Sequence, residues 1–156
     1  MHLEGVGGLT DGIVLMRRLL EDFWDTIHPE IDEGDLEYRV APLEWLGSTY
    51  LGPALRAVPL TVSGLATPDF QVSRDVGAEA DFEGDKDKLK ARQAKIDEGK
   101  ISAEEFDDAV GETPKAFYKK LSADIAASIE AIDALEALTD EKFGQMLAPS
   151  YKDLRG

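Results

Sequence analysis

Apolar side chains recur at three- and four-residue steps over three stretches of the chain, which is the spacing of an amphipathic helix. The stretches cover about residues 10–27, 40–51 and 114–138. Each helix would place its apolar residues along one face. We therefore expect the three helices to pack together as the core, with Leu20 on the first and Ile125 on the third buried between them.

Capping residues and prolines set the limits of the remaining elements. His28–Pro29 ends the first helix, because a residue that precedes proline disfavours the α conformation. Thr67, followed by proline, is typical of a cap and opens a short helix to about residue 76. Ser102 and Glu105 have the spacing of a capping box. Residues 139–141 predict a further short helix after the long one.

Two segments between the helices have a different character. Residues 58–65 alternate apolar and polar positions around Pro59, which predicts an extended connection rather than a central strand. Residues 77–100 are rich in charge and poor in large apolar side chains, so we expect a charged, mobile joint around an exposed helix. The prediction is an all-α fold, a single irregular multi-helix domain over residues 1–156 with one long C-terminal helix and short extended connections.

Composition and charge narrow the function. The 156 residues include no cysteine, which excludes disulfides, thiolate metal ligands and a cysteine nucleophile. The net charge of −15 disfavours nucleic acid and anionic membrane surfaces as partners. No apolar run approaches the roughly 20 residues of a membrane span, so we expect no direct membrane insertion and a cytoplasmic location. Proteins with basic or mixed surfaces are the expected partners.

The residues that could carry chemistry are few. His2 and His28 lie in none of the metal or nucleophile motifs that catalytic histidines occupy. The acid pairs at residues 104–105 and 107–108 invite a hydrolase reading, but a catalytic acid needs a desolvated cleft, and this helix is expected to be exposed. Acids at residues 81–87 lack the glycine and closing glutamate of a calcium loop. We therefore predict no catalytic residue, no cofactor, no metal and no enzymatic activity.

Two features favour a role in structure and binding. Trp24 and Trp45 stand near the ends of the first two apolar stripes, with Arg39 between them. A guanidinium stacks well on indole rings, so Trp24, Arg39 and Trp45 are predicted to form a structural cluster, with Asp25 or Glu44 pairing with the arginine.

The acidic loop, residues 30–37, lies between the first two helices. Its three carboxylates Asp32, Glu33 and Asp35 are candidate partner-binding residues, because exposed charge steers association.

Several motifs together resemble a known family. They are Gly8-Leu9, Phe23-Trp24-Asp25-Thr26-Ile27-His28-Pro29, Tyr38-Arg39-Val40, Leu43-Glu44-Trp45-Leu46, Arg56-Ala57-Val58-Pro59-Leu60-Thr61, Thr113-Pro114, Phe117-Tyr118, Phe143-Gly144 and Ala148-Pro149-Ser150. This pattern resembles the N-terminal ImpA-type region of TssA proteins, which are components of the bacterial type VI secretion system. Family members normally have further helices before the glycine-leucine segment and a C-terminal oligomerising domain. We therefore expect this chain to be a fragment of a longer protein.

The resemblance implies a non-enzymatic role in assembling the baseplate and the contractile tail sheath. Its implied partners are other baseplate or sheath proteins, and oligomerisation would depend on the C-terminal domain that is absent here. Two alternatives remain open: a generic acidic helical adaptor of another bacterial complex, and a hydrolase that uses carboxylates.

Overall fold

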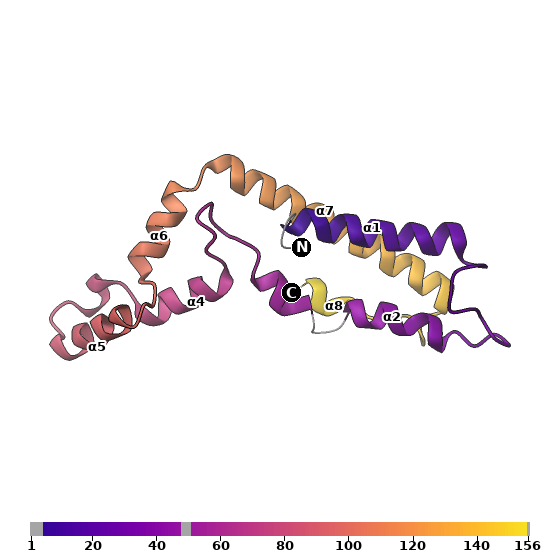
Figure 1. Cartoon of the computed structure of the whole chain (residues 1–156), viewed down its shortest axis with the longest axis horizontal. Helices are drawn as coiled ribbons and strands as arrows, with labels where there is room; N and C mark the ends of the chain where they lie inside the picture. Colours follow the sequence, from indigo (N-terminus) through magenta and orange to yellow (C-terminus); the bar gives the residue numbers. More distant parts are fainter. Residues whose placement is uncertain (1–4, 48–50, 156) are drawn as a thin grey trace. The chain divides into compact units, whose positions relative to one another are not determined.

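The computed structural model describes residues 5–47 and 51–155, and it is built of helices joined by turns (Figure 1). The α-helices are α1 (Gly5–Phe23), α2 (Glu37–Gly47), α3 (Leu51–Arg56), α4 (Thr67–Val76), α5 (Lys86–Asp97), α6 (Ala103–Glu112), α7 (Lys115–Phe143) and α8 (Lys152–Arg155). A 3₁₀ helix, η1, covers Glu79–Phe82. The described residues contain no β-strand, and the prediction of an all-α fold with one long C-terminal helix is confirmed.

The chain divides into two compact units where the sequence had suggested one domain. Unit one consists of Met1–Leu55 and Lys120–Gly156, and unit two is Arg56–Lys119. The middle segment has a small core of its own, because α4 packs against α5 and α6, and η1 packs against α5. Its buried apolar residues, Ala66, Val76, Ala103 and Phe106, lie on α4, on α6 and just before α4.

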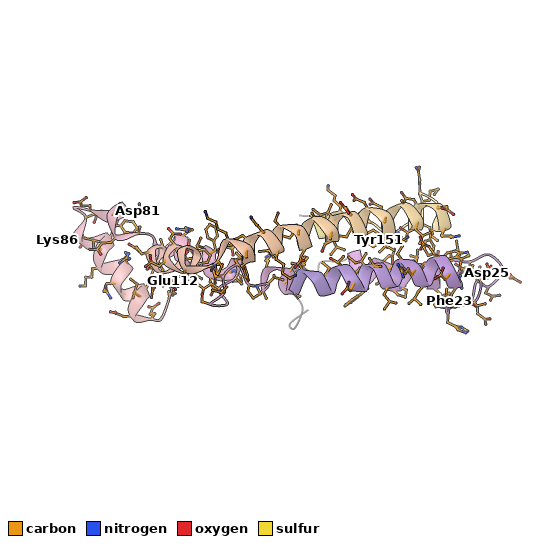
Figure 2. All side chains as sticks on the ribbon, turned by 90° about the horizontal axis from the view of Figure 1, so that it is seen from above. Phe23, Asp25, Asp81, Lys86, Glu112 and Tyr151 are labelled. Carbon is orange, nitrogen blue, oxygen red and sulfur yellow. The ribbon has the colours of Figure 1, made fainter. Side chains whose placement is uncertain are left out.

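The core of unit one lies between α1, α2 and α7, as predicted. Contacts between residues 7 and 124, 10 and 128, and 24 and 143 show that α1 and α7 run side by side in the same direction (Figures 1 and 2). The cluster of buried side chains consists of Leu9, Ile13, Leu20, Val40, Leu43, Leu46, Ala131, Ile132, Leu135, Phe143 and Tyr151. All three predicted stripes contribute to it, so the expected core of three helices is confirmed.

The helix α1 begins and ends earlier than the sequence predicted. It begins at Gly5 instead of about residue 10, because Val6 and Leu9 continue the apolar stripe and are buried. Low glycine propensity hid this extension. At the other end the carbonyl oxygen of Phe23 accepts from the amides of residues 26 and 27, at 2.9 and 2.7 Å, which closes the helix four residues before the predicted end.

The helix α7 includes the start of the short helix that was predicted to begin at residues 139–141, and it ends at Phe143. Thr139 is fully buried, and its hydroxyl donates to the carbonyl oxygen of Glu136, so the expected cap residue sits inside one continuous helix. Ile125 was predicted to be buried, but its side chain is 44% exposed. The N-terminal end of α1 meets α7 at Ser128, whose hydroxyl lies 3.4 Å from the carbonyl oxygen of Val6. Because residue 7 of α1 lies beside Asp124, Ile125 is at the N-terminal limit of the surface that α1 covers.

The helix α2 starts at Glu37, three residues before the predicted start, so Pro42 lies inside the helix instead of in its first turn. The last residue of α2, Gly47, lies against the returning C-terminal segment: a Cβ on Gly47 would overlap the carbonyl oxygen of Ser150. Only glycine permits this close approach. Tyr50, which was predicted on the buried side of this helix, lies outside the described residues.

Unit two follows the predicted order of helices with shifted ends. The capping box of Ser102 and Glu105 at α6 is confirmed, with hydrogen bonds of 3.2 and 2.9 Å. The cap of α4 is residue 66 instead of Thr67. Phe106 is buried and meets the Phe70 ring at 5.4 Å, whereas Val110 on the same helix is 38% exposed.

Residues 58–65 form a tight turn as well as extended chain. The amide of Leu60 donates to the carbonyl oxygen of Leu65 at 2.7 Å, and Thr61 is almost completely buried. The hydroxyl of Thr113 accepts from the amide of Val62 at 3.2 Å, which ties this connection to the end of α6.

Candidate partner-binding surface

Arg39, on the first turn of α2, fastens the end of α1 and the start of the following loop. Its side chain is only 5% exposed. Nη1 donates to the carbonyl oxygen of Trp24 at 2.6 Å, and Nη2 donates to the carbonyl oxygens of Ile27 and Pro29 at 2.6 Å. Nε also donates to Pro29 at 2.9 Å. Backbone oxygens that follow the end of a helix would otherwise lack partners, and the planar five-donor fork of arginine satisfies three of them at once.

The Trp24 ring completes this junction. The guanidinium of Arg39 lies 4.9 Å from its centroid and the Nζ of Lys142 lies 5.6 Å from it, so two cations approach one indole. The ring of Phe143 meets it edge-on at 5.2 Å. The junction therefore joins α1, α2 and the end of α7.

The structure brings two of the three predicted cluster residues together. Trp24 and Arg39 are in contact, whereas Trp45 is 57% exposed farther along α2. The carboxylates proposed to pair with Arg39 do not do so, and Asp25 and Glu44 are exposed. Backbone carbonyl oxygens replace them because the chain between α1 and α2 folds back over the guanidinium. Sequence spacing gives no signal for such backbone partners.

The acidic loop is shaped by a tight turn at its centre. Asp32 and Asp35 form an isolated bridge, with the amide of Asp35 donating to the carbonyl oxygen of Asp32 at 2.7 Å. Glu33 and Gly34 between them have φ of +49° and +87°, the left-handed values of a type I′ turn. Asp35 also accepts from the amide of Glu37 at 2.8 Å, at the positive end of α2. The three candidate carboxylates Asp32, Glu33 and Asp35 are all exposed.

Beside this loop, a groove of about 490 Å³ lies between α2 and the chain that returns after α7. Its lining residues are Glu37, Tyr38, Val40, Ala41, Glu44, Met146, Leu147 and Ala148. The sequence alone does not reveal this groove. Tyr38, Ala41 and Trp45 fall on the side of α2 opposite Leu43, and that periodicity could have drawn attention to the outer face. No local pattern shows that Met146 lies beside it.

The acid-rich helix α6, which prompted a hydrolase alternative, contains two carboxyl groups whose pKa is lowered, Glu104 and Asp107. The backbone amide of Glu79 donates to Glu104 at 2.6 Å and Arg92 donates to it at 2.7 Å, and these hydrogen bonds, the amide first, lower the pKa of Glu104 to about 2. The hydrogen bonds from Arg74, the shorter at 2.5 Å, lower the pKa of Asp107. A general acid requires the opposite shift.

The acids around residues 81–87 serve as caps. Asp85 accepts from the amide of Lys88 at 3.1 Å, and Asp81 accepts from the amide of Ala78 at 3.0 Å. Across residues 5–47 and 51–155, no group of three or more His, Asp or Glu side chains is placed to hold a metal ion. Nor does any helix in these ranges have the length and apolarity required to cross a membrane.

Comparisons with known proteins find similarity to components of the type VI secretion system. Residues 1–48 match the family model described as ImpA, N-terminal, type VI secretion system. The type VI secretion system component TssA1 of Pseudomonas aeruginosa is 36% identical over 64 residues, which cover 39% of this chain and 19% of that protein.

The fold has a solved counterpart with a similar sequence. It is the N-terminal domain, including the conserved ImpA_N region, of the TssA component of the type VI secretion system from Burkholderia cenocepacia. The two superpose with a TM-score of 0.77 and 33% identity, over 96% of this chain and 58% of that one. The chain thus spans less than two thirds of either relative. The predicted resemblance is confirmed.

Proposed function

Because the chain carries the N-terminal ImpA-type region of TssA proteins, we propose that it is an assembly component of a bacterial type VI secretion system. In this proposal it works in the cytoplasm without catalysis and contributes to baseplate and contractile tail sheath assembly through protein–protein contacts. The family match over residues 1–48 and the likeness to the TssA domain over 96% of the chain support the secretion role over that of a generic acidic adaptor.

The observation that carries a binding role is the presentation of the acidic loop. The loop leaves the firmly bonded junction at Arg39 and displays Asp32, Glu33 and Asp35 on a tight turn. Because both ends of the loop are anchored, its charges keep a defined position relative to α2. Exposed charge of this kind speeds encounter and sets orientation, while apolar anchors nearby supply the affinity.

The test is the association rate with purified sheath and baseplate proteins of the same secretion system. Asp32→Asn, Glu33→Gln and Asp35→Asn together remove three charges and retain an acceptor at the start of α2. We expect slower association with the partner and a weaker dependence of that rate on salt, with the free energy of unfolding little changed.

A matched control removes the same charge elsewhere. Asp87→Asn, Asp108→Asn and Glu112→Gln neutralise three exposed acids of unit two. Equal kinetics for the loop variant and the wild type at low salt would show that the loop only links two helices. Binding to none of the sheath or baseplate proteins would overturn the proposed function itself.

A further inference from the structure

The groove beside α2 exposes side chains that are normally covered. Tyr38 is 75% exposed and Met146 is fully exposed, at 101%, on its two sides. Trp45, seven residues after Tyr38 and 57% exposed, lies on the same outer side of α2. Aromatic residues are enriched at interface centres, and methionine adapts to varied apolar partners. A concave surface framed by such residues is typical of a docking site.

The charges of the groove show which kind of partner fits it. Glu37 and Glu44 both line it, and no lysine or arginine does. In the described part of the chain, neither glutamate takes part in an ion pair. They are seven residues apart on one helix, which is two turns and about 10.5 Å along the axis. Two negative charges therefore stand at a fixed spacing along an apolar groove.

We propose that this groove binds an amphipathic helix of another protein, whose apolar face is flanked by two basic side chains seven residues apart. The proposal rests on the proposed function, and it specifies the chemistry of the partner. The apolar face packs on Met146, Leu147 and Ala41. The two basic side chains pair with Glu37 and Glu44, because a seven-residue step places them at the same spacing. The exposed ring of Tyr38 offers a further surface for a cation.

A pair of synthetic peptides tests the proposal directly. Both are 18-residue amphipathic helices of one composition, with two arginines seven residues apart in the first and five apart in the second. A five-residue step turns the second arginine about 140° around the helix, so that it leaves the face of the first. We expect the seven-residue peptide to bind at least about fivefold more tightly. We also expect its amide shift changes, in a ¹⁵N-labelled full chain, to centre on residues 37–45 and 146–148.

Two double variants and a control variant test which residues of the chain bind the peptide. Glu37→Gln with Glu44→Gln should abolish the preference between the peptides, and Tyr38→Ala with Met146→Ala should weaken binding of the seven-residue peptide about tenfold. Leu15→Ala with Leu19→Ala removes exposed apolar side chains from α1 and should change neither result. Circular dichroism melting confirms that each variant is folded.

The outcomes separate this inference from the proposed function. Equal affinity for both peptides, shift changes centred outside the groove, or an equal loss in the α1 control would overturn the groove assignment, and so would no binding at all. A chain that binds sheath or baseplate proteins but fails these tests keeps the proposed function without the groove. A chain that passes them but binds no secretion protein keeps the groove and loses the function.

Discussion

Arg39 holds both the ring and the backbone of Trp24. Its guanidinium lies 4.9 Å from the centroid of the indole, and its Nη1 donates to the carbonyl oxygen of the same residue at 2.6 Å. A single side chain from α2 thus fixes the orientation of the aromatic residue that follows α1. The angle between these helices, and the position of the acidic loop between them, depend on this pair.

Replacing Arg39 should therefore destabilise unit one. Arg39→Ala leaves three carbonyl oxygens without their donor, and we expect a loss of about 2–4 kcal/mol in the free energy of unfolding. Arg39→Lys should lose nearly as much, because an ammonium cannot make the same fork. Urea unfolding followed by tryptophan fluorescence measures both, with the half-buried Arg17→Ala as control. Wild-type stability in Arg39→Ala would contradict the role of the junction.

Truncation of Leu20 and of Ile125 to alanine should change the free energy of unfolding by very different amounts, although both residues lie on apolar stripes. Leu20 is 5% exposed in the core of unit one, so Leu20→Ala should cost about 2–5 kcal/mol. Ile125 is 44% exposed, so Ile125→Ala should cost less than about 1 kcal/mol. The denaturant midpoints of the two variants, compared with that of the wild type, measure the two losses of stability. A large loss in Ile125→Ala would mean that this part of α7 is covered after all.

Acid should loosen unit two through Glu104. The pKa of this carboxyl is lowered from 4.5 to about 2, first by the amide of Glu79 and then by Arg92 among others. A lowered pKa contributes stability above pH 4.5 that is lost as the pH falls towards 2. The amide shift of Glu79 should titrate with a midpoint near pH 2. Glu104→Gln should remove that titration and Glu112→Gln should leave it intact; a midpoint near 4.5 in the wild type would refute the assignment.

Strong alkali should destabilise unit one through Tyr151. Burial raises the pKa of its hydroxyl from 10.0 to about 12. A raised pKa gives stability that is complete below pH 10 and is lost as the pH rises to 12, because the unfolded chain releases the proton first. The loss amounts to about 2–3 kcal/mol at most. Between pH 10 and 12, the melting temperature of the wild type should fall more steeply with pH than that of Tyr151→Phe. Parallel curves for the two proteins would contradict the raised pKa of the Tyr151 hydroxyl.

Residues 77–100 remain the segment predicted to open most easily. The helix α5 within it has no fully buried residue, although Arg92 donates to the carbonyl oxygen of Gly77 at 3.2 Å and to Glu104 at 2.7 Å. Few buried contacts oppose its opening. Hydrogen exchange should be faster in α5 than around Leu135 in α7. Equal protection in the two helices would show that the Arg92 bonds suffice to hold the segment.

Features that depend on near neighbours along the chain could be predicted from the amino-acid sequence. The helical class, the stripes of α1, α2 and α7, the capping box at Ser102 and the exposed acidic loop all follow from spacing and residue type over a few positions. The family resemblance follows from short motifs such as the one at residues 23–29. These features were predictable because the interactions that create them span one or two helical turns.

Which parts of each apolar stripe are covered depends on how distant segments of the chain pack together. Periodicity placed Ile125 and Leu135 on one face of α7, but α1 and α2 cover Leu135 and leave Ile125 exposed. Likewise, the partners of Arg39 are backbone carbonyl oxygens that the loop brings to it, and Met146 reaches α2 only because the chain turns back after Phe143. Burial and hydrogen-bond partners depend on segments that can lie more than a hundred residues away, such as Thr10 and Ser128, and a local pattern carries no information about their position.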